Sequence, residues 1–181
     1  MRRDTEATRA AILLAAHYMP SRQSHTDVTL SAVADRAGVS PPLIMKYFRS
    51  KDRLLAQVMS FESDAMVLLD APLEDLGRHM VRHVLVSQTE QGVDPLLRIV
   101  FVSLQEGLGD ILRANFRHEV RDRLAERLDG PDTGLRAELA VGMLLGLGVM
   151  YGIARGEALR ATSTATAVER LGPSLQRCLT E

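Results

Sequence analysis

Residues 29–51 read TLSAVADRAGVSPPLIMKYFRSK, and this stretch decides the fold. Apolar residues at helical spacing lie on both sides of Gly38, and Ser40 followed by Pro41 is a typical start for a second short helix. Glycine permits the positive φ of a tight turn, and Ala34 is small where the two helices would cross. The spacing therefore predicts a helix-turn-helix, and the apolar positions that fix its interhelix angle are Ala34, Val39, Ile44 and Phe48.

An αα-hairpin inside a helical bundle would explain Gly38 and the apolar residues equally well. It does not explain why the same stretch and its flank hold Lys46, Tyr47, Arg49, Lys51 and Arg53. Residues 1–60 contain nine basic and five acidic residues, a net charge of +4, whereas residues 61–181 contain thirteen and eighteen, a net charge of −5. The total charge of −1 alone would argue against nucleic-acid binding, but the asymmetry favours a DNA-binding N-terminal end.

Helical periodicity dominates the rest of the chain, and no strand pattern stands out. We expect an all-α fold of about nine helices, with a loop at 21–27. A three-helix DNA-binding domain with the helix-turn-helix occupies residues 1–50, and a helical ligand-binding and dimerisation domain occupies residues 51–181. The predicted helices cover residues 5–20, 30–37, 41–47 and 50–70. The next two have apolar faces at 73–84, between Pro72 and Gly92, and at 96–104, ending near Gly107. The last three cover 112–128, 134–158 and 165–179.

Composition narrows the class of protein further. Of 181 residues, 46% are hydrophobic and 25% are charged, as in ordinary soluble domains. The lone Cys178 excludes an intrachain disulfide framework and gives no zinc cluster. The N-terminus lacks a secretory signal pattern, and the apolar run Leu139–Ile153 is too short to span a bilayer and holds four glycines. We therefore expect a cytoplasmic protein without a membrane partner.

Enzymatic readings find little support in the sequence. Asp75, His79 and His83 are spaced to share one helix face, but two helical histidines do not complete a metal site. Cys178 lacks the context of a nucleophile, and residues 107–109 lack the downstream glycine and the strand of a phosphate-binding loop. We expect no enzyme activity, no metal and no cofactor. A small-molecule-binding helical bundle or a helical enzyme without DNA activity is the alternative, and it leaves the basic helix-turn-helix unexplained.

The runs VADRAGVS (33–40) and IMKYFRSKDRLL (44–55) follow one N-terminal helix and precede a long helical C-terminus. Over residues 8–60 the chain resembles the TetR/AcrR family of transcriptional regulators. RAELAVGMLLGLGVMYGIARGEAL (136–159), followed by a final amphipathic helix, resembles one common subgroup of that family's C-terminal domains. The resemblance implies a homodimer that binds operator DNA, with a small molecule that binds the C-terminal domain and changes this binding. We expect a repressor released from a pseudo-palindromic operator.

The second helix of a helix-turn-helix presents its N-terminal residues to base edges in the major groove. Lys46 is the one strong donor there, so we expect it to contact a guanine, while DNA shape supplies much of the remaining specificity. Met45 departs from the tyrosine of many relatives and cannot make a hydroxyl–phosphate bond. By position and resemblance, the base or groove contacts are Ser31, Ser40, Pro41, Pro42, Leu43 and Lys46, and the phosphate contacts are Thr29, Tyr47 and Lys51.

The most apolar part of 134–158 holds Gly142, Gly146, Gly148 and Gly152. Glycines are costly in a helix, so four of them need a reason. Close packing in a dimer is the reason that the resemblance implies, and an ordinary buried central helix is the alternative. The expected dimer interface consists of Gly142, Gly146, Val149, Leu171 and Leu175. The candidates for a pocket that binds a small apolar effector, each of which would also suit a plain core, are Met80, His83, Val84, Phe101, Gln105, Phe116, Leu147, Met150 and Tyr151.

Overall fold

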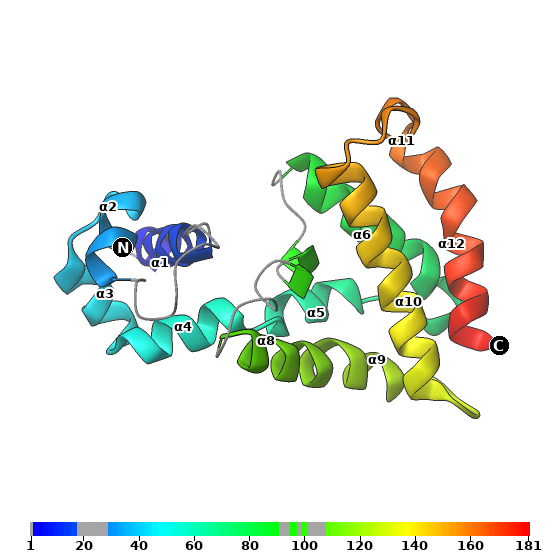
Figure 1. Ribbon diagram of the computed structural model, residues 1–181, viewed down its shortest axis with the longest axis horizontal. Coiled ribbons are helices and arrows are strands. Elements are labelled where there is room, and N and C mark those ends of the chain that lie inside the picture. The colour runs from blue at the N-terminus through cyan, green and yellow to red at the C-terminus, as the bar shows by residue number, and fades with distance from the viewer. Residues whose placement is uncertain (1, 18–28, 91–94, 98, 101–107) are drawn as a thin grey trace. The chain divides into compact units, whose positions relative to one another are not determined.

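The computed structural model describes residues 2–17, 29–90, 95–97, 99–100 and 108–181. This part of the chain is helical with turns and contains no strand, which confirms the all-α prediction. The chain divides into two compact units, shown in Figure 1. Unit 1 contains residues 1–60 and 101–112, and unit 2 contains residues 61–100 and 113–181.

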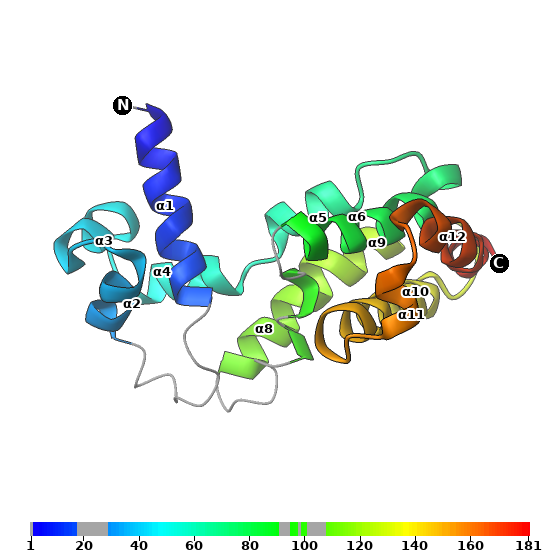
Figure 2. The same cartoon turned by 90° about the horizontal axis from the view of Figure 1, so that it is seen from above.

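Among the described residues, unit 1 contains four complete helices around a small apolar core, together with residues 108–112. The four helices are α1 (Arg2–His17), α2 (Leu30–Ala37), α3 (Pro41–Phe48) and α4 (Lys51–Met59). Helix α1 packs on α2 and α4, and α3 packs on α2 and α4 (Figure 2). Unit 1 therefore includes α4, which the sequence placed in the C-terminal domain. The buried side chains include Ile12, Ala15, Ala16, Val33, Ala34, Ile44, Phe48, Leu54, Leu55, Val58 and Met59.

Unit 2 is a bundle in which α6 (Leu76–Glu90), α10 (Thr133–Gly148) and α12 (Thr164–Thr180) pack on one another. Helix α8 (Leu108–Phe116), whose first five residues are assigned to unit 1, continues into a π-helical segment η3 (Arg117–Asp122) and α9 (Arg123–Ala125). Helix α10 likewise continues into a π-helical segment, η4 (Val149–Ile153). The shorter elements are α5 (Glu62–Leu68), the 3-10 turns η1 (Leu73–Asp75) and η2 (Pro95–Leu97), and α11 (Glu157–Ala161).

The sequence prediction differs from the structure at two helix boundaries. The helix expected over 50–70 is two helices, because the backbone leaves helical geometry at Ser60 (ψ 142°) and Phe61 (ψ 5°). The helix expected over 134–158 ends at Ile153, and a separate α11 follows Arg155, whose φ is +52°. The predicted loop at 21–27 and most of the predicted helix 96–104 lie outside the described residues.

Helices α6 and α12 cross at two glycines. A Cβ atom on Gly77 would lie 2.6 Å from the backbone nitrogen of Gln176, and one on Gly172 would lie 2.7 Å from Cγ of Arg78. The Gln176 side chain accepts from the N–H of Gly77 (2.8 Å) and donates to the carbonyl of Leu73 (2.8 Å). This amide therefore joins α12 to the backbone at the start of α6. The carbonyl of Leu73 also accepts from the N–H of Leu76.

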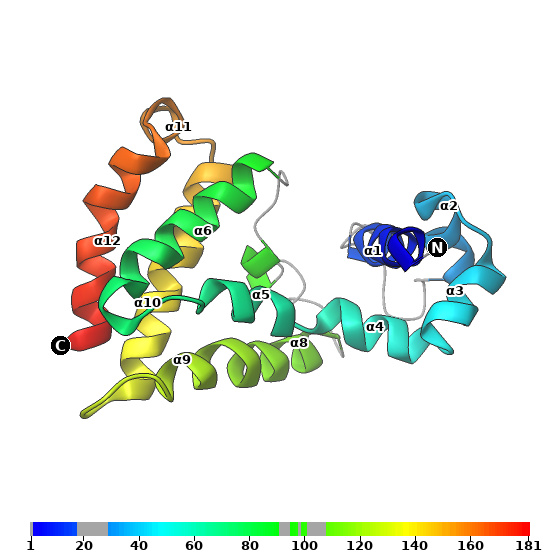
Figure 3. The same ribbon diagram turned by 180° about the vertical axis from the view of Figure 1, so that it is seen from behind.

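Helix α5 is bound at both ends by the helix that runs through η3 and α9 (Figure 3). The carboxylate of Glu119 accepts a hydrogen bond from the N–H of Phe61, and Arg123 pairs with Glu62 at 3.2 Å. At the other end, the Arg127 guanidinium donates to the carbonyls of Leu69 and Ala71. A negative group at the N-terminus and a positive group at the C-terminus both suit the helix dipole of α5.

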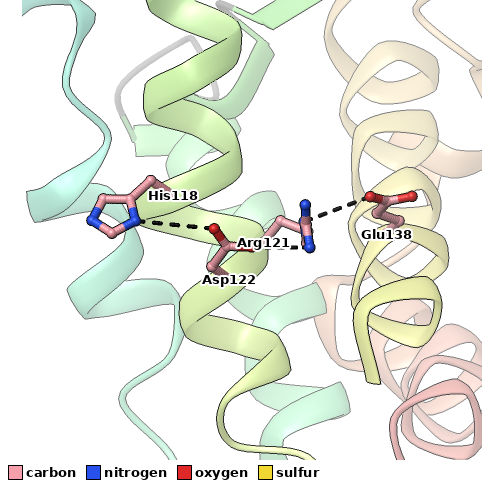
Figure 4. A network of polar contacts seen from close by, with 4 residues as sticks. All are labelled: His118, Arg121, Asp122 and Glu138. Atoms are coloured by element: carbon pink, nitrogen blue, oxygen red, sulfur yellow. Dashed lines mark ion pairs between the residues drawn. The ribbon is translucent and has the colours of Figure 1, made fainter. Parts of the chain in front are cut away.

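A polar network joins segment η3 to α10 (Figure 4). The Arg121 guanidinium lies 3.0 Å from a carboxylate oxygen of Asp122 and 3.5 Å from one of Glu138 on α10. The ring of His118 lies 4.0 Å from Asp122 at the outer side of the network. Because Arg121 is only 26% exposed, its two carboxylate partners offset the cost of partly burying the charge.

From Thr133 to Ile153 the helix runs for 21 residues without a break. By length and composition this stretch could cross a membrane. The prediction that the apolar run is too short to span a bilayer was therefore wrong, because the helix begins at Thr133 and not at Leu139. A single such helix is weak support for a membrane protein, because the core helix of a soluble protein meets the same criterion. Only 39% of its most apolar window is buried within this chain, which leaves an apolar face uncovered by the described residues.

Candidate nucleic-acid interface

The turn between α2 and α3 has the geometry that the sequence predicts. Gly38 has φ +66° and ψ 32°, the left-handed conformation that costs glycine least, and its N–H bonds to the carbonyls of Ala34 and Asp35. The N–H of Val39 also donates to the carbonyl of Ala34 (3.0 Å). These bonds end α2 and direct the chain into α3 within three residues.

The N-cap residues of α2 and α3 differ in how their hydroxyl groups are used. Thr29 Oγ1 accepts from the N–H of Ala32 (3.1 Å) and so caps α2, while its hydroxyl hydrogen can still donate to a further acceptor. Ser40 lies at the N-cap of α3 in extended conformation, but its side chain makes no capping hydrogen bond. Since Pro41 follows at N1 and has no N–H, fewer donors need a cap there. The exposed Ser40 hydroxyl is therefore not engaged in capping.

Helix α3 has a buried face and an exposed face. Ile44 is fully buried and Phe48 is 2% exposed, and they pack in the core with Val33 and Ala34 of α2. The opposite face points to solvent, with Leu43 and Tyr47 half-buried at its edges. Ser31 on α2 is also exposed. The exposed residues at the start and along the outer face of α3 are Ser40, Pro41, Pro42, Met45 and Lys46.

The junction of α3 and α4 adds positive charge next to this face. Arg49 is exposed and has φ +65°, and its N–H bonds to the carbonyl of Met45 (2.9 Å). Ser50 caps α4 by accepting from the N–H of Arg53 (3.2 Å), and Lys51 is the first residue of that helix. Residues 40–53 carry four basic side chains against one acidic side chain, Asp52. A helix N-terminus flanked by cations is a favourable place for a phosphate group.

The pocket candidates of unit 2 lie in different environments. Met80 and Val84 of α6 are fully buried and Leu147 of α10 is 9% exposed, so all three belong to the core. The ring of Phe116 packs edge-on against Phe61 with centroids 5.2 Å apart. Two candidates from the predicted set, Phe101 and Gln105, lie outside the described residues.

The remaining pocket candidates are Tyr151, Met150 and His83, and the rings of Tyr151 and His83 contact neighbouring side chains. The half-buried Tyr151 ring lies under the guanidinium of Arg160 (5.5 Å), and Met150 is 50% exposed. His83 stacks on His79 with ring centroids 6.5 Å apart. Burial, and second the neighbouring His79, lower the pKa of His83 below 6.5. His83 is therefore neutral at pH 7.

The residues considered for a metal do not form a ligand cluster. His79 Nε2 lies 2.8 Å from the carbonyl oxygen of Val67, so this ring nitrogen is used in a bond to α5. Asp75 is exposed at the end of η1. Within the part of the chain that the structure describes, no group of three His, Cys, Asp or Glu side chains is arranged to hold a metal ion.

The expected dimer residues divide between surface and core. Gly142 and Gly146 are exposed on α10, and a Cβ on either would meet no described atom within 4 Å. Val149 and Leu171 are half-buried. Leu175 is fully buried in its own protomer, so its side chain has no surface to offer to a partner.

Sequence reasoning missed two exposed leucines on the same face of α10. Leu135 is 56% exposed and Leu139 is 53% exposed, and they precede Gly142 and Gly146 at helical spacing. We call Leu135, Leu139, Gly142 and Gly146 the α10 stripe. The spacing of four, three and four residues was a signal in the sequence, but the nearly uniform apolarity of this helix concealed which face is outward.

Two family models match this chain. Residues 12–58 match the model described as bacterial regulatory proteins, tetR family, and residues 74–179 match the one described as tetracyclin repressor-like, C-terminal domain. A search of curated proteins found no match. The C-terminal match alone spans more than half of the chain, so this protein belongs to the TetR family.

Solved structures agree over nearly the whole chain. A TetR-family regulator from Streptomyces coelicolor A3 is 25% identical, with coverage of 96% of this chain and 95% of that chain and a TM-score of 0.56. A putative TetR-family regulator from Rhodococcus sp. is 17% identical, with 96% and 98% coverage and a TM-score of 0.65. NalD, the secondary repressor of the MexAB-OprM multidrug efflux pump in Pseudomonas aeruginosa, is 20% identical, with 98% coverage of both chains and a TM-score of 0.62.

Family membership settles the class of function. The chain is a ligand-responsive, DNA-binding transcriptional regulator and not an enzyme. Regulators of this family bind operator DNA, act as dimers and are generally cytoplasmic. The alternative of a helical bundle or enzyme without DNA activity is thereby excluded.

Proposed function

We propose that this regulator is a repressor whose homodimer reads a pseudo-palindromic operator with its two α3 helices. The observation that carries this proposal is the exposed face of α3, on which Lys46 is the strong donor beside Pro41, Pro42 and Met45. Lys46 donates to a guanine, and the prolines and Leu43 pack against thymine methyl groups. Ser31 and Ser40 supply further groove contacts.

Phosphate contacts fix the register of the helix on the duplex. In this proposal they come from Thr29, whose hydroxyl hydrogen can donate, from Tyr47, and from Lys51 at the start of α4. Because few side chains of α3 can donate hydrogen bonds to bases, sequence-dependent DNA shape contributes much of the specificity.

The dimer forms through the α10 stripe together with Val149 and Leu171. Exposed glycines allow two helix backbones to approach closely, and the leucines supply apolar area that a monomer leaves in water. A two-fold axis would place the two recognition helices about 34 Å apart, one turn of DNA, or a multiple of it.

A small apolar effector binds unit 2 and shifts the dimer between two states. The side chains that we propose to contact the effector are the apolar Met80, Val84, Phe116 and Leu147, the neutral His83, and Met150 and Tyr151 of η4. The effector releases the operator only to the extent that it binds the two states with different affinity.

Selection of bound fragments from random DNA tests the proposal. We expect an enriched pseudo-palindrome whose half-sites are separated by one helical turn or a multiple of it. Selection without any enriched site would overturn the proposed readout. Reporter transcription from the selected site, with and without the regulator, then distinguishes a repressor from an activator.

A further inference from the structure

Arg9 joins three helices of unit 1 through one side chain. It projects from α1, and its Nη2 donates a hydrogen bond to Oε1 of Gln57 on α4 (2.6 Å). The same guanidinium lies over the ring of Phe48, 5.7 Å from the centroid. Phe48 is the last residue of α3 and is 2% exposed.

This contact lies at the C-terminal end of α3. Helix α3 has only eight residues, and the chain enters α4 two residues after it ends. Its connection passes through Arg49, whose positive φ is unfavourable for a residue with a side chain. The buried Phe48 ring thus joins the end of α3 to the core of unit 1, and the guanidinium of Arg9 lies over this ring while bonded to Gln57.

We propose that Arg9 is a positioning residue for DNA readout, which acts on α3 through Phe48 and Gln57 without contacting the DNA itself. The inference rests on the proposed docking of α3. Base contacts made by α3 depend on the orientation of its axis, because hydrogen bonds weaken steeply when distance or angle departs from the optimum. Contacts to phosphate tolerate small displacements better, because charge attraction falls off gradually with distance.

A direct phosphate contact is the competing role, because Arg9 is exposed. The two roles make opposite predictions. A phosphate contact contributes equally to all DNA sequences and adds about 0.9 to the salt slope for each phosphate neutralised. A positioning residue contributes to the specific complex alone and leaves the salt slope unchanged.

The test compares Arg9→Gln, Gln57→Leu, the double variant and Arg9→Lys in the full-length protein. Binding is measured on the selected operator and on a scrambled duplex over a range of salt concentrations. The Gln57→Leu variant leaves formal charge unchanged, so it isolates positioning from charge. Arg82→Gln, at an exposed arginine of α6 in unit 2, is the matched control for the loss of one charge.

We expect Arg9→Gln and Gln57→Leu each to weaken operator binding by about 3- to 10-fold, since exposed contacts of this kind are individually modest. Binding to the scrambled duplex and the salt slope should not change. The double variant should lose less than the product of the single losses, because both act through one contact. Arg9→Lys, which retains a cation over the ring, should recover part of the loss.

Three results would overturn the inference. In the first, Arg9→Gln loses equal affinity for both duplexes and has a reduced salt slope, while Gln57→Leu binds like the parent. That result would assign Arg9 to a phosphate contact. The second is unchanged operator binding in Arg9→Gln. The third is a loss that disappears once binding is corrected for the folded fraction, which assigns Arg9 to stability alone. If the parent protein itself selects no operator, the proposed readout fails, and that outcome is visible before any variant is made.

Discussion

The carboxylate of Glu119 accepts a hydrogen bond from the backbone N–H of Phe61, the residue that precedes helix α5. These residues lie 58 positions apart in the chain, and Phe61 is fully buried. The bond therefore supplies, from a distant helix, the cap that α5 lacks locally, since the side chain at its own N-cap is phenylalanine.

Replacement of Glu119 by alanine should lower the free energy of unfolding by about 1–2 kcal/mol, because the N–H of Phe61 then loses the hydrogen bond to this carboxylate. Glu119→Gln should cost less, since the amide oxygen can still accept but the charge no longer favours the helix dipole. Urea denaturation at fixed protein concentration measures both. Glu126→Ala, at an exposed carboxylate near the end of α9, is the control, and an equal effect there would contradict the assignment.

Gly77→Ala should destabilise unit 2 by about 2–3 kcal/mol through overpacking. The added Cβ would meet backbone atoms, 2.6 Å from the nitrogen of Gln176 and 2.8 Å from the carbonyl oxygen of Gly172, so the helices α6 and α12 must separate. Thermal and urea unfolding measure the loss. Gly134→Ala is the matched control, because its Cβ would find ordinary contact at 3.5 Å. That substitution should be neutral or raise stability by up to about 1 kcal/mol through helix propensity.

Lys46→Ala and Lys51→Ala should weaken DNA binding in different ways. Loss of a guanine contact by Lys46 should cost about 1–3 kcal/mol and relax specificity at one base pair of each half-site. Loss of a phosphate contact by Lys51 should weaken all sequences alike and reduce the salt slope by about 0.9 per subunit. Operator titrations with single-base variants separate the two patterns. Arg170→Ala, an exposed charge of unit 2, should change neither, and parental behaviour of both lysine variants would refute the docking.

Leu139→Glu should convert the dimer to monomer at micromolar concentration. A carboxylate in the middle of the α10 stripe would lose its hydration without a partner, and we expect dimer dissociation constants to rise by about 100-fold or more. Sedimentation velocity over a concentration series measures this. Met66→Glu replaces an apolar residue of α5 that is 65% exposed and lies outside the stripe, so it should leave the dimer intact. A dimeric Leu139→Glu protein would remove the stripe from the interface.

The stability of the protein should fall as pH drops below about 6.5, and His83 should carry part of that fall. Its pKa is lowered in the folded state by burial and by His79, so the unfolded chain binds more protons in this range. The contribution is complete above the unfolded pKa and is lost as pH decreases toward the lower folded pKa. Unfolding free energies between pH 5 and 8 should depend less on pH in His83→Gln. An NMR titration placing the His83 pKa at or above 6.5 would contradict this.

Local signals in the sequence predicted unit 1 well. Gly38, the helix start at Ser40 and Pro41, and the apolar spacing of Ile44 and Phe48 each act within a few residues, so their consequences can be predicted from the local sequence. The bonds from Arg9 to Gln57 and from Glu119 to Phe61 join residues 48 and 58 positions apart. No periodicity encodes such pairs, so neither contact could be predicted from the sequence.

Which residues of unit 2 face the core and which face a partner chain was harder to predict than the fold of unit 1, for a physical reason. Helix α10 is apolar on nearly all sides, so its pattern does not distinguish a face that packs inward from one that packs on another chain. Leu175 was expected at a partner but fills the protomer core, whereas Leu135 and Leu139 are exposed. The break at Ser60 and Phe61 was likewise hidden, because the apolar spacing continues across it.

The α10 stripe also affects the solubility of the single chain before it dimerises. A newly made protomer presents these leucines to water and to every other apolar surface in the cell. In the proposed dimer, dimerisation must therefore be faster than non-specific association with other apolar surfaces. Dilution below the dissociation constant of the dimer would expose the leucines to water again. Solubility of this regulator is then a property of the pair and not of the single chain, so variants that weaken pairing should be lost to aggregation or proteolysis before any defect in DNA binding is detected.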